Sequence, residues 1–341
     1  MSEQTKENIK IPEPKIGNNT LKQLWGSYNF VFVFAAIFIA YLAVNINAVN
    51  LLALANILRH SSVVGVVALA MGLIILTGDI DLSVGSTVAL VGGVSVLVFN
   101  ATGSIALTFT FGILGGAVCG AVNGVLVSLL KMPSFIATLA TMMIFRSVAS
   151  WLMSAHLVVP MFRLDHELPA FDAYFRIGNG NFLSIPILFI IFLAVTVCIV
   201  YLCTSTKFGK SIYAVGSNEK AARLAGVNVA GVRVIVFALA GSLTGLAAVL
   251  LSGQMSGIMA STAGRMYELY AIAAVVIGGI SMAGGKGKML GVIFGVVTFT
   301  IVDNIIMALR FNPLINDTFS GLILLAAILL QIAQKRGKGT T

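Results

Sequence analysis

The chain has 341 residues, of which 58% are apolar and only 10% carry a charge. An average soluble domain has roughly 25% charged residues, and the mean hydropathy here is +1.02, so the composition excludes a soluble globular protein. Many apolar runs approach the roughly 20 residues that a helix needs to cross a bilayer. Alternating ten-residue strands, the mark of a membrane barrel, are absent from the sequence. We therefore predict an all-α polytopic membrane protein embedded in a lipid bilayer.

The apolar runs predict about ten transmembrane helices in one membrane domain over residues 30–333. In chain order the spans are expected at residues 30–44, 63–76, from about 87 to 99, 104–130, 134–154, 185–203, 234–251, 266–281, 289–309 and 316–332. Residues 50–59 predict a helical piece that is too short to cross. Residues 1–29 and 334–341 predict polar tails, and the polar start favours no cleavable signal.

The formal charge of +9 indicates membrane orientation and gives no reason to expect a nucleic-acid partner. About 15 basic residues fall on one predicted side of the membrane and about five on the other, and the basic side of such proteins faces the cytoplasm. Both termini and a loop over residues 204–233 are therefore expected in the cytoplasm. The longest loop on the opposite side covers residues 156–184.

Glycine recurs every four residues in two of the predicted spans. A repeat of small residues at this spacing lets two membrane helices approach closely. The repeat favours packing within one subunit, and a dimer face is the alternative. The glycines concerned are Gly112, Gly116, Gly120 and Gly124 in one span and Gly291 and Gly295 in another.

Two carboxylates interrupt the apolar sequence in the stretch T-G-D-I-D-L-S-V-G-S. Ionisable groups at membrane depth are costly and usually face a cavity or a partner. One interpretation is a broken helix in which Asp81 or Ser83 caps the next span and free backbone groups line a pathway. The alternatives are an ordinary cytoplasmic turn or an ion site that includes Asp79.

Five further polar residues lie within or near predicted spans: Asn123, Arg146, Glu268, Asp303 and Asn304. Hydrogen bonds between helices are their favoured role, and contact with a substrate is the second possibility. The three cysteines, Cys119, Cys198 and Cys203, lie in or at the end of apolar runs, have no disulfide or metal spacing, and are expected to pack as small apolar side chains.

The cytoplasmic loop contains the signals of a short helix. Ser217 or Asn218 can cap its start. Glu219 and Arg223 are four residues apart and can pair on one face. Gly226 suits the left-handed position after the last turn. The alternatives are a solvated loop with one helical turn, or a helix that docks into a cytoplasmic partner.

The sequence contains no nucleotide-binding or catalytic pattern. The stretch G-G-I-S-M-A-G-G-K-G is similar to a phosphate loop, but that motif needs glycine where Ile280 stands and serine or threonine where Gly287 stands. No nucleophile, acid–base or metal constellation accompanies it. We predict that the chain is not an enzyme and holds no cofactor or metal.

Four motifs in order carry a family resemblance. They are I-L-T-G-D-I-D-L-S-V-G-S (75–86), P-S-F-I-A-T-L (133–139), K-F-G-K-S-I-Y-A-V-G-S-N-E-K-A-A-R-L-A-G-V-N-V (207–229) and Y-E-L-Y-A-I-A-A-V-V-I-G-G-I-S-M-A-G-G-K-G (267–287). From about residue 50 to its end, the chain resembles the permease subunit of the monosaccharide ABC importers, the ribose and galactoside type.

This resemblance implies a multi-subunit importer in a bacterial cytoplasmic membrane. Two permeases, identical or paired, form the pathway, and a sugar-binding protein docks on the outer face, which includes residues 156–184. A cytoplasmic ATPase binds ATP and Mg and engages the E-A-A…G segment. In this sequence the segment comprises Ser217, Asn218, Glu219, Ala221, Ala222, Arg223 and Gly226.

The chain departs from the family pattern at four positions. Asp79 stands where the family usually has glycine, Tyr270 where it commonly has aspartate, and Asp303 where asparagine is frequent. Arg265 precedes the Y-E-L motif where a small or uncharged residue is expected. These departures leave the sugar open among pentoses, hexoses and signalling sugars.

Two other functions compete with the sugar importer. A stand-alone ion-coupled secondary transporter would use Asp79, Asp81, Glu268 and Asp303 at membrane depth. A related ABC permease for branched-chain amino acids or another non-sugar solute would share the architecture.

Overall fold

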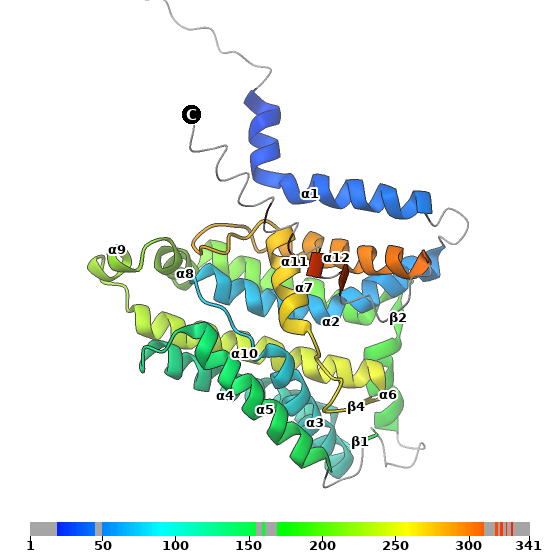
Figure 1. The fold of residues 1–341 in the computed structure, drawn as a ribbon. Helices are drawn as coiled ribbons and strands as arrows, with labels where there is room; N and C mark the ends of the chain where they lie inside the picture. Colours follow the sequence, from blue (N-terminus) through cyan, green and yellow to red (C-terminus); the bar gives the residue numbers. More distant parts are fainter. Residues whose placement is uncertain are drawn as a thin grey trace, which may run out of the picture.

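A computed structural model gives the fold of the chain (Figure 1) and describes residues 19–44, 50–154, 159–160, 169–309, 318–319, 321–322, 325 and 329. Seven helices in this part of the chain are long and apolar enough to cross a membrane, so the all-α polytopic class is confirmed. They are α2 (Leu51–Leu76), α3 (Val84–Thr102), α4 (Ile105–Ser128), α5 (Ser134–Ser154), α7 (Ile187–Ser205), α10 (Val229–Met255) and α12 (Gly291–Ala308).

Shorter elements complete the fold. The further helices are α1 (Asn19–Val44), whose apolar part covers residues 30–44, α6 (Pro169–Asn179), α8 (Lys207–Ser217), α9 (Glu219–Leu224) and α11 (Tyr267–Ile277). Two antiparallel strand pairs join β1 (Val159–Pro160) to β4 (Gly257–Ile258) and β2 (Asn181–Phe182) to β3 (Ile185–Pro186). The expected tenth span over 316–332 and the C-terminal tail lie almost entirely outside the described residues.

The expected break between residues 59 and 63 was wrong, because α2 runs without interruption from Leu51 to Leu76. The polar side chains in this stretch form hydrogen bonds that are compatible with a continuous helix. The hydroxyls of Ser61 and Ser62 donate to the carbonyl of Leu58 at 3.0 and 2.6 Å. Arg59 points away from the helix axis and donates to the carbonyl of Asn179 at 3.1 Å, so its charge is partnered outside α2.

The loops over residues 204–233 and 156–184 contain more helix than the sequence predicted. The first consists of α8 and α9 followed by the start of α10, so residues 229–233 belong to a membrane helix. Asn228 begins α10 by accepting a hydrogen bond from the Gly231 amide at 3.0 Å. The second loop contains α6, which packs against α10 through Tyr174, whose hydroxyl donates to the carbonyl of Val249 at 2.8 Å.

Helix α2 lies at the centre of the packed helices. Its second half is fully buried from Val66 to Leu76. It contacts α7, α10, α11 and α12, whereas α4, α5 and α7 leave much of their apolar surface exposed, as helices that face lipid or another subunit do. The bundle has two ends in Figure 1, with α8 and α9 at one and α6, β1 and β4 at the other.

Helices α4 and α10 form the most extensive helix contact in the described chain. The four glycines of α4 face this contact. A Cβ at Gly116 would meet the carbonyl oxygen of Gly241, and one at Gly120 would meet that of Phe237. Packing within one subunit therefore accounts for the glycine repeat. Gly291 and Gly295 of α12 face α11 in the same way.

A non-helical segment over residues 256–266 connects α10 to α11. It starts with Ser256 and ends with Met266, both in left-handed backbone conformations, with φ of 52° and 64°. Arg146 from the middle of α5 donates two hydrogen bonds of 2.7 Å to the carbonyls of Ala260 and Ala263. Non-helical backbone is tolerated at membrane depth where it is buried in protein, and Arg146 supplies the donors that this segment lacks.

Candidate functional site

Helix α9 projects from one end of the bundle between α8 and α10 (Figure 1). The side chain of Asn218 caps it by accepting from the Ala221 amide at 3.0 Å, whereas Ser217 is the last residue of α8. Gly226 follows the last turn with φ of +82°, as expected for a left-handed helix end. Ala222 is 5% exposed and packs α9 onto the body of the protein. The short helix therefore has a fixed position.

The outer face of α9 carries an exposed leucine. Leu224 is 90% exposed, and Ala221 and Arg223 beside it are also exposed. A groove of about 720 Å³ runs along this face and is lined by Asn218, Glu219, Lys220, Arg223 and Leu224. An apolar side chain on a rigid, polar-rimmed projection is typical of a contact with a second protein.

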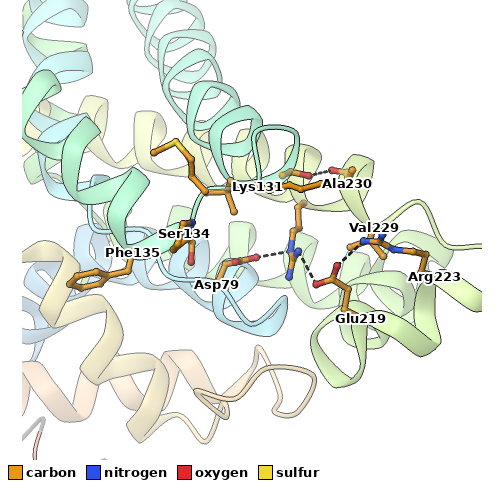
Figure 2. Close-up of a pocket in the computed structure, with 13 residues that line it drawn as sticks. Asp79, Lys131, Ser134, Phe135, Glu219, Arg223, Val229 and Ala230 are labelled. Atoms are coloured by element: carbon orange, nitrogen blue, oxygen red, sulfur yellow. Dashed lines mark hydrogen bonds and ion pairs between the residues drawn. The ribbon is translucent and has the colours of Figure 1, made fainter.

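A row of four charged residues links α9 to the turn between α2 and α3 (Figure 2). Arg223 pairs with Glu219 at 2.8 Å, as the sequence predicted. Glu219 also lies 3.1 Å from Nη1 of Arg233, and Nε of Arg233 lies 2.9 Å from Asp79. Burial raises the pKa of Asp79, and the opposite charge of Arg233 lowers it to a smaller extent.

These charges line a cavity of about 590 Å³ at the same end of the bundle. The cavity lies between α9, the start of α10 and the turn from α4 to α5. Besides the charged residues it is lined by apolar and small side chains, among them Val127, Phe135 and Val229. Figure 2 shows Lys131 at its rim on the α4–α5 turn.

Sequence reasoning missed Arg233, which it counted only as a basic residue of the cytoplasmic loop. The signal available was Asn228, a residue type that begins helices. A helix that starts there contains Arg233 in its second turn, close to the membrane surface. No sequence pattern, however, placed Arg233 beside Asp79.

Asp81, Ser83 and Asn123 form a second polar cluster where α3 begins. Asp81 accepts hydrogen bonds of 2.7 Å from the amide and the hydroxyl of Ser83. Asn123 of α4 donates to the Ser83 hydroxyl at 2.7 Å. All three are buried. Asp81 therefore stabilises the start of α3, and Asn123 joins α3 to α4.

Three further candidates lie on α11 and α12. Glu268 lies in the first turn of α11 and faces α3, where a Cβ at Gly85 would come 2.5 Å from its carboxylate. Asn304 bonds within α12 to the carbonyl of Thr300 at 2.8 Å, and Asp303 lies beside it on the same helix. Glu268 therefore lies on α11, whereas Asp303 and Asn304 are neighbours on α12.

Comparison with known proteins identifies the family. The family described as branched-chain amino acid transport system / permease component matches residues 53–328. The chain belongs to this permease family. Together with the seven apolar helices, this makes it a multi-pass protein of a bacterial membrane. No solved structure matches the chain.

Several curated members are similar over most of their length. The ribose import permease RbsC of Haemophilus influenzae is 36% identical over 80% of this chain and 83% of its own. The L-arabinose transport system permease AraH of Escherichia coli is 34% identical over 93% of this chain and 94% of its own. RbsC of Bacillus subtilis is 35% identical over 95% of this chain and 97% of its own.

Proposed function

We propose that the chain is the membrane-spanning permease of an ATP-driven importer for a monosaccharide. The observation that carries this proposal is α9, a capped and anchored helix that presents Leu224 to a partner at one end of a family permease. A cytoplasmic ATPase subunit would grip α9, bind ATP and Mg, and perform the hydrolysis. The permease itself would supply the pathway.

The arrangement in the membrane follows from the charge bias. With ten crossings, both termini and α9 lie in the cytoplasm, since basic residues gather on that side. The opposite end, with α6 and the β1–β4 pair, would then face a sugar-binding protein outside. A second permease copy or a paired permease would complete the pathway, and the exposed apolar faces of α4 and α5 are available to it or to lipid.

A pentose such as ribose or arabinose is the substrate that the relatives favour. The relatives described above are named for these two sugars, although the family as a whole is described by branched-chain amino acids. A galactose-like hexose stays within the proposed class. The sugar-binding protein would carry most of the selectivity.

A pull-down from native membranes in mild detergent tests the ATPase contact. The tagged chain should bring down an ATPase with a phosphate loop. Leu224→Asp should weaken this association about tenfold or more, because a central apolar anchor would be lost. Leu183→Asp is a matched control, because Leu183 is 83% exposed but lies at the opposite end, between β2 and β3.

A chain that comes down alone while folded would contradict the importer and favour an ion-coupled transporter.

The purified complex also tests the substrate. In proteoliposomes its ATPase rate should rise with the partner binding protein loaded with D-ribose, L-arabinose or D-galactose. Stimulation only by branched-chain amino acids would overturn the assignment to sugars.

A further inference from the structure

We propose that Asp79 and Arg233 form a charged tie that passes movement of α9 to the turn between α2 and α3 and from there to α5. Asp79 and Arg233 are thus positioning residues for coupling. The inference rests on the proposed function of α9 as the ATPase contact. It adds a defined route from that contact into the membrane domain.

The first step of the route is the guanidinium of Arg233 between two carboxylates. It faces Glu219 on α9 at 3.1 Å and Asp79 on the turn at 2.9 Å. Exposed ion pairs contribute little. The side chains of Asp79 and Arg233 are only 9% and 20% exposed, whereas that of Glu219 is 39% exposed. Water therefore screens the Asp79–Arg233 attraction less than the Glu219–Arg233 attraction, and the two pairs in series oppose separation of α9 from the turn.

The second step is the turn itself, which is bonded to α5. The amide of Ile80 donates to the hydroxyl of Ser134 at 3.3 Å, and the amide of Leu82 donates to that of Thr138 at 3.1 Å. The hydroxyl of Thr77 lies 3.2 Å from the carboxylate of Asp79 and orients it. A shift of Asp79 therefore changes backbone hydrogen bonds that connect to the first turns of α5.

A backbone contact beside the tie fixes the end of α2. The amide of Gly285 donates to the carbonyl of Leu76 at 2.9 Å, and Gly216 of α8 abuts the same carbonyl. These contacts begin on α8 and on the segment after α11. The charged tie differs from them because Glu219 connects it to α9, the proposed contact with the ATPase.

Hydrogen exchange measured by mass spectrometry tests the tie without a transported solute. The permease is placed in nanodiscs with and without its ATPase subunit and a non-hydrolysable ATP analogue. ATPase binding should slow exchange both in α9 and at the amides of Ile80 and Leu82, by about threefold or more for a partly buried charge contact. In Asp79→Asn, α9 should still be protected while the response of the turn is lost.

Four variants make the result specific to the charges. Asp79→Glu and Arg233→Lys keep the ion pair and should restore most of the response, whereas Arg233→Gln should behave like Asp79→Asn. Lys131→Gln is the matched control. It removes a positive charge from the same cavity, and among the described residues Lys131 forms no ion pair. Equal melting temperatures of the variants would show that they are folded.

The outcomes separate this inference from the function on which it rests. An unchanged response of the turn in folded Asp79→Asn, with α9 protected, overturns the tie alone. A wild-type chain whose α9 is not protected by the ATPase overturns both proposals. Loss of the response in Lys131→Gln as well would also overturn the tie, because any charge in the cavity would then suffice.

Discussion

Glycine determines how closely two membrane helices approach in this protein. In lipid there is no hydrophobic drive between helices, so association depends on close packing. Gly120 of α4 faces the backbone of Phe237 on α10, whereas Gly115 of the same helix meets only the side chain of Val91 at 3.6 Å. Only a glycine that faces the backbone of another helix, as Gly120 does, leaves no room for a larger side chain.

Gly120→Ala should destabilise the protein by about 1–3 kcal/mol, because the new methyl group must force α4 away from the α10 backbone. A lower melting temperature in detergent would measure this. Gly115→Ala is the matched control and should be neutral or slightly stabilising, since alanine favours helix. Equal stability of the two variants would contradict the packing argument.

At the scale of elements, the connection from α10 to α11 is the least regular part of the membrane domain. It precedes α11, which has only 11 residues. Arg146 supplies donors to two of its carbonyls. A charged residue in the span of α5 is thus explained by the backbone that it satisfies.

Arg146→Met should lower the free energy of unfolding by roughly 2 kcal/mol or more, because two carbonyls lose their donors. Exchange at the amides of residues 259–266 should rise, and thermal denaturation should report the loss. Arg223→Met removes an exposed guanidinium on α9 and should leave both measurements near wild type. An Arg146→Met protein as stable as wild type would show that the segment finds other donors.

The whole molecule has two different ends. One has the projecting α9 and the charged cavity, and the other has α6 and the two strand pairs (Figure 1). The expected spans up to residue 309 each coincide with a helix, but α1 and α11 have apolar stretches shorter than the seven long spans. Because the two ends differ, the orientation of the protein in the membrane is defined by which of them faces the cytoplasm.

Labelling with a membrane-impermeant maleimide decides the orientation. In a background with its three native cysteines replaced by alanine, Leu183→Cys should react in intact spheroplasts, since Leu183 is exposed at the end proposed to face outward. Lys220→Cys on exposed α9 should react only after the cells are lysed. The reverse pattern would contradict the cytoplasmic placement of α9, and with it the ATPase contact.

The sequence by itself determined the features that depend on local chemistry. Apolar run length predicted the membrane class and the helices of the expected spans up to residue 309, apart from the false break in α2. Asn218, the Glu219–Arg223 pair and Gly226 predicted α9, because caps, pairs and left-handed ends depend on residues a few positions apart. Family motifs predicted the permease, and the family comparison agrees.

Only the tertiary structure decided which distant residues meet. Asp79 and Arg233 are far apart in the chain, and their 2.9 Å contact arises because α10 packs beside the end of α2. The contact of Arg59 in α2 with the carbonyl of Asn179, 120 residues away in the chain, is likewise visible only in the structure. Local pattern cannot supply such contacts, because lone polar residues in a membrane chain have many possible partners, and packing selects among them.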